Sequence, residues 1–348
     1  MGWWIDPLHS PPLSLPPGWL PSCLNDGWTY RDRIPPAGAG MGVVAFYASR
    51  YAHSGVAMWE QRLAAGEISR NGEPLRADAV LAGGDRLLWR RPPWREPAVP
   101  VGWGVIHDDG DLLVIDKPSG LPVLPAGGFL EHTVLRLLER RHGDDPAGLP
   151  RPVHRLGRFT SGLLVSARRP ATRAWLSAQL RESTGSLASG AAGGAPPCRK
   201  LYRALLVPGR LTLAIGESLV ITTPIGRRPH PPLGAIWCAA EAGDPAALPA
   251  RSRLTLLEQG SEADLVEVAI VTGRPHQIRI HCAAIGAPLR GDPLYLPGGR
   301  ARPGELPGEG GYRLQARWLR LQQPEGPVLE LQVPPAEGLG TAAAPQAG

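Results

Sequence analysis

Residues 154–165 read H-R-L-G-R-F-T-S-G-L-L-V, and the rest of the chain is organised around this stretch. Arg155 and Arg158 flank Gly157, and a threonine-serine-glycine turn then leads into an apolar run of strand type. A glycine between two arginines, just before small hydroxyl residues, lets the backbone come close to an anion. The stretch predicts a phosphate or nucleic-acid site, and the alternative is a β-turn with two solvated arginines.

The composition indicates a globular protein without a membrane segment. The 348 residues are 43% hydrophobic and include 11 tryptophans, which is enough for a real core. No apolar run reaches the length of a membrane span, and the proline-rich start does not resemble a signal peptide. The four cysteines lie far apart without a C-x-x-C pair, so we expect no zinc site, no disulfide and a reducing cytoplasm.

The charge balance gives modest support to an anionic partner. The net charge is +6, and arginine supplies almost all of it because lysine occurs only at Lys117 and Lys200. Guanidinium groups suit bidentate phosphate contacts and stacking on bases. Arginine enrichment also follows from nucleotide bias, so the charge alone does not identify a partner.

The segment boundaries predict two folded regions. We expect an irregular extension over 1–42, a small module over 43–91, a proline-set linker over 92–100, a large domain over 101–335 and a disordered tail over 336–348. In the large domain, strands mix with a few helices, and 224–249 reads mostly as loop. This pattern predicts an α+β fold with a mixed, largely antiparallel sheet and flanking helices.

The small module combines a helix with a hairpin. Val56, Trp59 and Leu63 have helical spacing, and Asn71-Gly72 is a strong hairpin signal. The order of helix, A-G-E-I-S-R-N-G strand and G-D turn resembles the αL RNA-binding module of ribosomal and tRNA-synthetase proteins. The alternative is an ordinary small α+β domain.

Two further polar groups fall in the large domain. Lys200 and Tyr202 share one face of a predicted strand. Residues 272–281, T-G-R-P-H-Q-I-R-I-H, follow the predicted strand 265–271 and read as a loop entering a strand. His276 and His281 would then face opposite sides, which disfavours a metal site. Phosphate-loop, nucleophile-elbow and dinucleotide motifs are missing from the sequence, so hydrolase and nucleotide-cofactor functions lack support.

Five segments together resemble the RluA-type pseudouridine synthase family. They are I-D-K-P-S-G-L (115–121), the opening stretch (154–165), K-L-Y-R-A-L-L (200–206), T-G-R-P-H-Q-I-R-I-H (272–281) and G-D-P-L-Y (291–295). Their order and spacing match the family over about residues 101 to 335. The resemblance implies isomerisation of uridine to pseudouridine in structured RNA, rRNA or tRNA, with no cofactor and no metal, by a monomer that flips the uridine out of its helix.

The resemblance also implies the roles of three positions. The family has an aspartate at position 157, which acts on the sugar. The tyrosine matching Tyr202 stacks on the uracil, and the arginine matching Arg279 pairs with the aspartate and lowers its pKa. The implied RNA contacts are Lys117, Arg155, Arg158, Thr160, Lys200, Arg274, His276, Gln277 and Arg279.

This chain departs from the family at the decisive residue, because Gly157 has no side chain. Asp116 and Asp292 are the candidate substitutes for the missing carboxylate. Without the aspartate, Arg279 is expected to be a free cation that binds RNA phosphate. A smaller departure is Gln315, where the family more often has histidine.

Three functions remain open at this point. The chain is an active synthase with a carboxylate from elsewhere, or an inactive RNA-binding or ribosome-assembly factor that keeps the fold. The third is an RNA chaperone that acts through the small module, for which the large domain is only a scaffold. The intact Tyr202, Arg279 and T-G-R-P-H-Q string favour the first.

Overall fold

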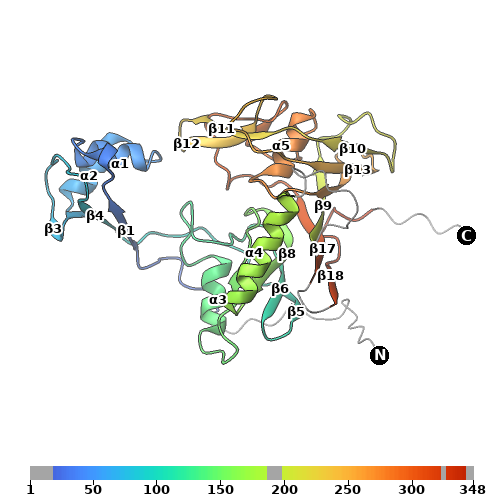
Figure 1. Ribbon diagram of the computed structural model, residues 1–348, viewed down its shortest axis with the longest axis horizontal. Helices are drawn as coiled ribbons and strands as arrows, with labels where there is room; N and C mark the ends of the chain where they lie inside the picture. Colours follow the sequence, from blue (N-terminus) through green and yellow to red (C-terminus); the bar gives the residue numbers. More distant parts are fainter. Residues whose placement is uncertain (1–18, 186–197, 323–326, 342–348) are drawn as a thin grey trace, which may run out of the picture. The chain divides into compact units, whose positions relative to one another are not determined.

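The computed structural model describes residues 19–185, 198–322 and 327–341. The chain divides into two compact units (Figure 1). Most of the small unit lies within Ser22–Pro97, and most of the described residues from Ala98 onward belong to the large unit. Within the described ranges, no helix is both long enough and apolar enough to span a membrane.

The small unit packs two helices on an antiparallel sheet of order β1-β4-β2-β3. Its elements are β1 (Trp28–Arg33), the 3-10 helix η2 (Pro36–Gly38), α1 (Val43–Arg50), α2 (Val56–Ala64), β2 (Ile68–Arg70), β3 (Glu73–Pro74) and β4 (Arg86–Arg91). The predicted helix is confirmed as α2, with Trp59 and Leu63 buried and Val56 exposed. The predicted turn is also confirmed, with positive φ angles of 52° at Asn71 and 97° at Gly72.

An irregular structure over residues 19–42 was wrongly expected, and residues 1–18 lie outside the described ranges. β1 pairs with β4 along its whole length. Tyr30 of β1 stacks on Trp89 of β4 with ring centroids 4.7 Å apart. The proline and glycine residues around β1 predicted an irregular segment. The six-residue strand forms because it pairs with β4, which lies more than fifty residues later in the chain.

The large unit is built on a ten-stranded sheet. Its path is β10-β13-β14-β9-β17-β8-β6-β5, with β18 on β17 and β7 on β8. The strands of this sheet are β5 (Gly104–Asp108), β6 (Leu112–Lys117), β7 (Arg151–Pro152), β8 (Thr160–Ala167), β9 (Cys198–Leu206), β10 (Ser218–Ile221), β13 (Ser252–Glu258), β14 (Asp264–Ile270), β17 (Leu314–Gln322) and β18 (Val328–Gln332). Their pairs are antiparallel except β8–β17, which confirms the α+β class.

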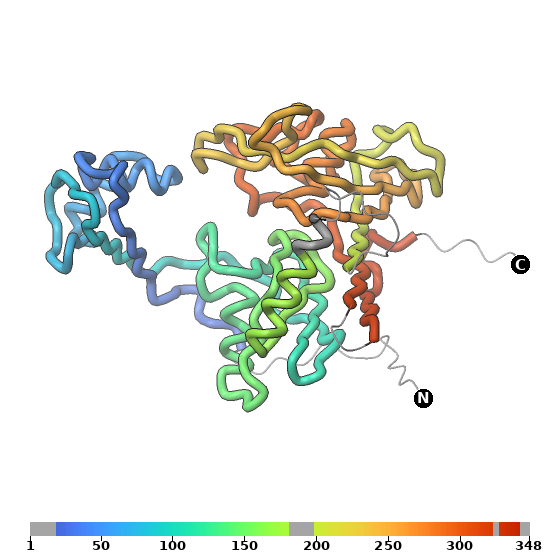
Figure 2. Tube along the Cα trace, viewed as in Figure 1, coloured from blue at the N-terminus to red at the C-terminus, as the bar shows by residue number. Residues whose placement is uncertain are grey.

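The sheet brings together segments that are distant in sequence. β9, yellow-green in Figure 2, lies beside the red β17, which in turn pairs with β8. Gly162 of β8 has a φ of +97°, and a Cβ there would lie 2.2 Å from the carbonyl oxygen of Ala316 in β17. Only glycine permits this approach. Ala316 is also the register partner of Tyr202 in β9, so two of the five sequence segments meet on either side of β17.

Helices cover both faces of this sheet. They are α3 (Val134–His142), α4 (Pro170–Gly185) and α5 (Gln277–Ala284). Leu137 of α3 and Ile278 of α5 join one apolar cluster, whereas Leu176 of α4 joins the cluster on the other face, with Leu163 and Val165 of β8. β8 is therefore buried along its whole length.

The segment 272–281 was wrongly predicted to enter a strand, because α5 begins at Gln277. His276 takes the N-cap position with a left-handed φ of 56°. Every residue from Gln277 to Ala283 is buried, so this helix has no polar face and no 3.6-residue pattern to reveal it. The alternating Ile278 and Ile280 instead imitated a strand.

Two predicted irregular regions are also ordered. The segment 224–249 contains the hairpin strands β11 (Ile225–His230) and β12 (Gly234–Ala239), and β15 (Tyr295–Leu296) pairs with β16 (Arg300–Ala301). In the tail, Leu339 is buried against Leu205 and Leu265. Residues 342–348 and the glycine-rich stretch 186–197 lie outside the described ranges.

Candidate active site

Gly157 lies in the loop between β7 and β8. The backbone N–H of Thr160 donates to the Gly157 carbonyl over 3.0 Å, which closes a turn immediately before β8. Gly157 is exposed, whereas Thr160 is buried. The loop therefore presents backbone, and no side chain, at the position where the resemblance expects a carboxylate.

Tyr202 lies in the middle of β9 with only 8% of its surface exposed. It belongs to the same apolar cluster as Leu156, Ile278 and Tyr312, so the opening stretch, β9, α5 and the chain before β17 converge on one core. Burial raises the pKa of the Tyr202 phenol above its usual range. The phenol is accordingly neutral and can stack or donate a proton.

Arg279 is not the free cation that the sequence suggested. In the first turn of α5 its Nε and Nη2 atoms each donate to a carboxylate oxygen of Asp292 over 2.7 Å, and Nη1 donates to the Pro307 carbonyl over 3.0 Å. The two side chains are 3% and 0% exposed. Burial opposes the charge of Arg279, but the hydrogen bonds and charge of Asp292 outweigh it and raise the pKa of Arg279.

The two candidate carboxylates have different surroundings. Asp292 is fully enclosed and also accepts the backbone N–H of Leu294. Asp116 belongs to the opposite face of β6 from Lys117, because successive strand residues alternate. Burial raises the pKa of Asp116 to about 6, although Lys117 opposes the shift.

Lys117 is a structural cation and was wrongly predicted to contact RNA. It is 0% exposed, and its Nζ donates to the carbonyls of Pro118, Leu121 and Arg158 over 2.7, 2.8 and 3.1 Å. It thus fixes the 154–165 loop to the end of β6. Gln277 is likewise buried, and its amide bonds Thr272, Arg274, Arg251 and Ser252.

The other residues predicted to contact RNA differ in how exposed their side chains are. Arg155 is exposed, and Lys200 and Arg274 are half-buried. Arg158 stacks over Phe129 at 4.6 Å and donates to the Gly120 carbonyl, so part of its guanidinium is committed to the fold. Burial lowers the pKa of His276 to about 3, and its Nδ1 lies 2.6 Å from the Tyr295 hydroxyl.

Tyr312 is the site residue that sequence reasoning missed. A Cβ added at Gly157 would lie 2.6 Å from the Tyr312 hydroxyl oxygen and 3.2 Å from Thr160 Oγ1. The guanidinium of Arg279 lies 4.4 Å from the Tyr312 ring centroid. Tyr312 follows a glycine-rich loop that has no hydrophobic periodicity, so its burial could not be predicted. The one signal nearby was Gln315, three residues later, where the family more often has histidine.

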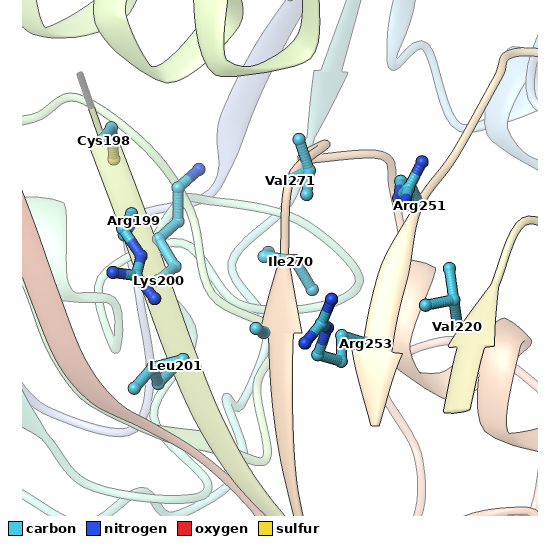
Figure 3. Close-up of a pocket in the computed structure, with 10 residues that line it drawn as sticks. Cys198, Arg199, Lys200, Leu201, Val220, Arg251, Arg253, Ile270 and Val271 are labelled. Carbon is cyan, nitrogen blue, oxygen red and sulfur yellow. The ribbon is translucent and has the colours of Figure 1, made fainter. Parts of the chain in front are cut away.

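A cavity of about 400 Å³ lies among β9, β10, β13 and β14. Its lining includes Arg199 and Lys200 of β9 together with Arg253 of β13 and Arg251, which directly precedes β13. Figure 3 shows the end of β14 between these two groups. Arg199, Arg251 and Arg253 are exposed. Four cations around one hollow favour an anionic ligand.

The described side chains contain no candidate metal centre. Across residues 19–185, 198–322 and 327–341, no group of three or more histidine, cysteine or acidic side chains could hold an ion. The four cysteines are free thiols.

Comparison with known proteins gives consistent matches. The family model described as RNA pseudouridylate synthase matches residues 111–284. An uncharacterized RNA pseudouridine synthase of Synechocystis is 40% identical over 83% of this chain and 93% of its own length. RNA pseudouridine synthase 5 of Arabidopsis thaliana is 36% identical over 86% and 89%. Ribosomal large subunit pseudouridine synthase D of Nitrosomonas europaea is 33% identical over 64% and 57%.

Proposed function

Because the chain belongs to the RluA-type RNA pseudouridine synthase family, we propose that it isomerises uridine to pseudouridine in a structured rRNA or tRNA. One relative is named for the large ribosomal subunit, which makes rRNA the first substrate to test. We also propose that it acts as a monomer. The free cysteines suit the reducing cytoplasm.

One observation carries this proposal. Tyr202 and Tyr312 share an apolar cluster, and Arg279, ion-paired with Asp292, lies 4.4 Å from the Tyr312 ring. Burying an ion pair gives little stability compared with apolar residues of the same volume. A protein that only binds RNA has no need of such a pair beside a buried phenol, whereas an enzyme needs fixed groups around the flipped base.

The RNA would approach over exposed and half-buried cations of the large unit. Lys200, Arg251 and Arg253 line the cavity on β9 and β13, and Arg155 and Arg274 flank the loops before β8 and α5. Guanidinium groups bind phosphate in bidentate fashion and stack on unpaired bases. Lys117 and Gln277 take no part in this surface because both are buried.

The small unit would supply a second RNA contact, as its resemblance to the αL module suggests. Arg33 and Arg86 are direct register partners on β1 and β4, and both are exposed, as is Arg31. Like charges placed opposite each other are unfavourable unless an anion binds between them. This arrangement supports phosphate binding on that sheet.

The test is pseudouridine mapping of RNA from a strain that lacks the gene, complemented by wild type or by Tyr202→Phe. We expect one or a few sites to lose pseudouridine in the deletion strain and to regain it only with wild type. Tyr202→Phe should reduce turnover, because the phenol is the group placed to move a proton. Tyr47→Phe is a matched control, since Tyr47 is a fully buried tyrosine of the small unit. Unchanged pseudouridine throughout the RNA of the deletion strain would contradict the proposed activity.

A further inference from the structure

The space beside Gly157 is filled by the hydroxyl of Tyr312. The Cβ of any residue at 157 would come within 2.6 Å of that oxygen, closer than Cβ atoms approach other atoms, whereas the next ring atom, Cζ, is 3.9 Å away. Thr160 Oγ1 lies at 3.2 Å, which is tight but tolerable, so the phenol oxygen causes the overlap. Glycine at 157 and tyrosine at 312 are thus sterically coupled: the absence of a side chain at 157 leaves the room that the phenol oxygen occupies.

The phenol is held firmly, yet its oxygen is uncommitted. Tyr312 is 2% exposed, Arg279 covers its ring at 4.4 Å and Phe159 meets it edge-on at 5.9 Å. Over the described residues its hydroxyl makes no hydrogen bond, and it is not one of the fully enclosed side-chain atoms that lack a partner. A buried phenol normally finds a partner for its hydroxyl. An oxygen that remains accessible and unbonded beside an exposed glycine is placed to meet a ligand.

We propose, resting on the proposed function, that the Tyr312 hydroxyl acts on the ribose of the target uridine in place of the carboxylate expected at 157. Asp292 is committed to Arg279, and the Tyr312 hydroxyl is the polar group nearest to a side chain at 157, ahead of Thr160 Oγ1. The guanidinium of Arg279, which is fixed by Asp292, stacks on the Tyr312 ring at 4.4 Å and so helps to hold the phenol oxygen beside residue 157. Tyrosine serves as the nucleophile at an anomeric carbon in sialidases, so the chemistry has a precedent.

The reaction balances without any other reactant. The Tyr312 oxygen bonds to C1′ as the N1–C1′ bond breaks, and the phenol proton passes to N1 of the departing uracil. After the uracil turns, its C5 bonds to C1′ and the bond from C1′ to the Tyr312 oxygen breaks. The proton that C5 loses passes through the Tyr202 hydroxyl to the phenolate, which restores both phenols and leaves pseudouridine with N1–H.

The test compares wild type with Tyr312→Phe, Gly157→Asp and the double variant Gly157→Asp/Tyr312→Phe on RNA from the deletion strain. We expect Tyr312→Phe to lower kcat by about 10³-fold or more, while RNA affinity and the melting temperature stay unchanged. Gly157→Asp should be inactive because its side chain collides with the Tyr312 oxygen. The double variant has room for the carboxylate and should recover at least about tenfold over Tyr312→Phe. A merely structural role of Tyr312 would not produce this recovery.

The outcomes separate this inference from the proposed function. Tyr47→Phe serves as the control for loss of a tyrosine hydroxyl and should keep wild-type turnover. If wild type is active and Tyr312→Phe retains its kcat, the inference fails and the synthase function stands. If wild type is inactive but the double variant forms pseudouridine, Tyr312 cannot replace the carboxylate and the inference fails. If no variant forms pseudouridine on any RNA, the proposed function fails as well.

Discussion

At the scale of single residues, Arg279 and Asp292 change the interpretation of the site. Both were identifiable from the sequence, one as the arginine of the fourth segment and the other as the aspartate of the fifth. Their pairing was not, because it depends on how α5 and the following loop fold back on each other. The arginine expected to be free is instead neutralised within the fold, so its charge is not available to RNA phosphate.

Removing one partner of the Arg279–Asp292 ion pair should destabilise the folded protein. In Asp292→Ala, Arg279 would remain buried with an uncompensated charge, and we expect the free energy of unfolding to fall by about 3–5 kcal/mol. Urea denaturation measures this loss. An apolar double variant, Arg279→Met/Asp292→Leu, should recover most of it, since it buries no charge. A loss below about 1 kcal/mol in the single variant would mean that the pair is more hydrated than its 0–3% exposure implies.

At the scale of elements, α5 shows the limit of pattern reading. Its residues are buried on all sides, so no polar stripe distinguishes it from a buried strand. A helix with one solvated face was easier to predict: α2 was predicted from the spacing of Val56, Trp59 and Leu63, of which Trp59 and Leu63 are buried. Burial on all sides removes the contrast on which periodicity depends.

The burial of α5 should make stability depend on pH through His281. This side chain is 0% exposed, its Nδ1 lies 2.9 Å from Ser252 Oγ and its Nε2 lies 3.0 Å from the Thr223 carbonyl. Burial lowers its pKa to about 4, although the Thr223 carbonyl opposes the shift. Between pH 4 and the ordinary histidine value of about 6.5, the unfolded chain binds the proton and the folded protein does not.

The stabilising effect of neutral His281 is therefore complete above pH of about 6.5 and is lost as pH falls towards 4. We expect the contribution of His281 to the free energy of unfolding to change by about 1.4 kcal/mol per pH unit in that window. Urea unfolding at several pH values, for wild type and His281→Gln, should show a shallower slope in the variant. Parallel curves would contradict this assignment.

At the scale of the whole molecule, the sequence predicted which segments make up the large unit, but it did not predict which of their side chains are exposed. The five segments identified the family, and Figure 1 shows the strands that carry three of them, β6, β8 and β9, in one sheet. Which cations remain exposed could not be predicted. Lys117 and Arg155 read alike as cations in family segments, but one is enclosed by three carbonyls and the other is exposed.

The exposed arginines and the net charge of +6 predict salt-sensitive RNA binding. Each phosphate contact releases counterions, so log K should fall linearly with log salt, with a slope of about −0.7 to −0.9 per contact. Replacing Arg251 and Arg253 together by glutamine should make the slope shallower by about 1 to 2. Binding that does not respond to salt would contradict the cationic surface.

The overlap between a side chain at 157 and the Tyr312 hydroxyl also predicts how the two positions vary among relatives. An aspartate at 157 would place its Cβ 2.6 Å from the Tyr312 oxygen, so aspartate and tyrosine fit together only if one of them shifts. The two positions should consequently covary among relatives: glycine at 157 should accompany tyrosine at 312, and larger residues at 157 should accompany side chains that lack this oxygen.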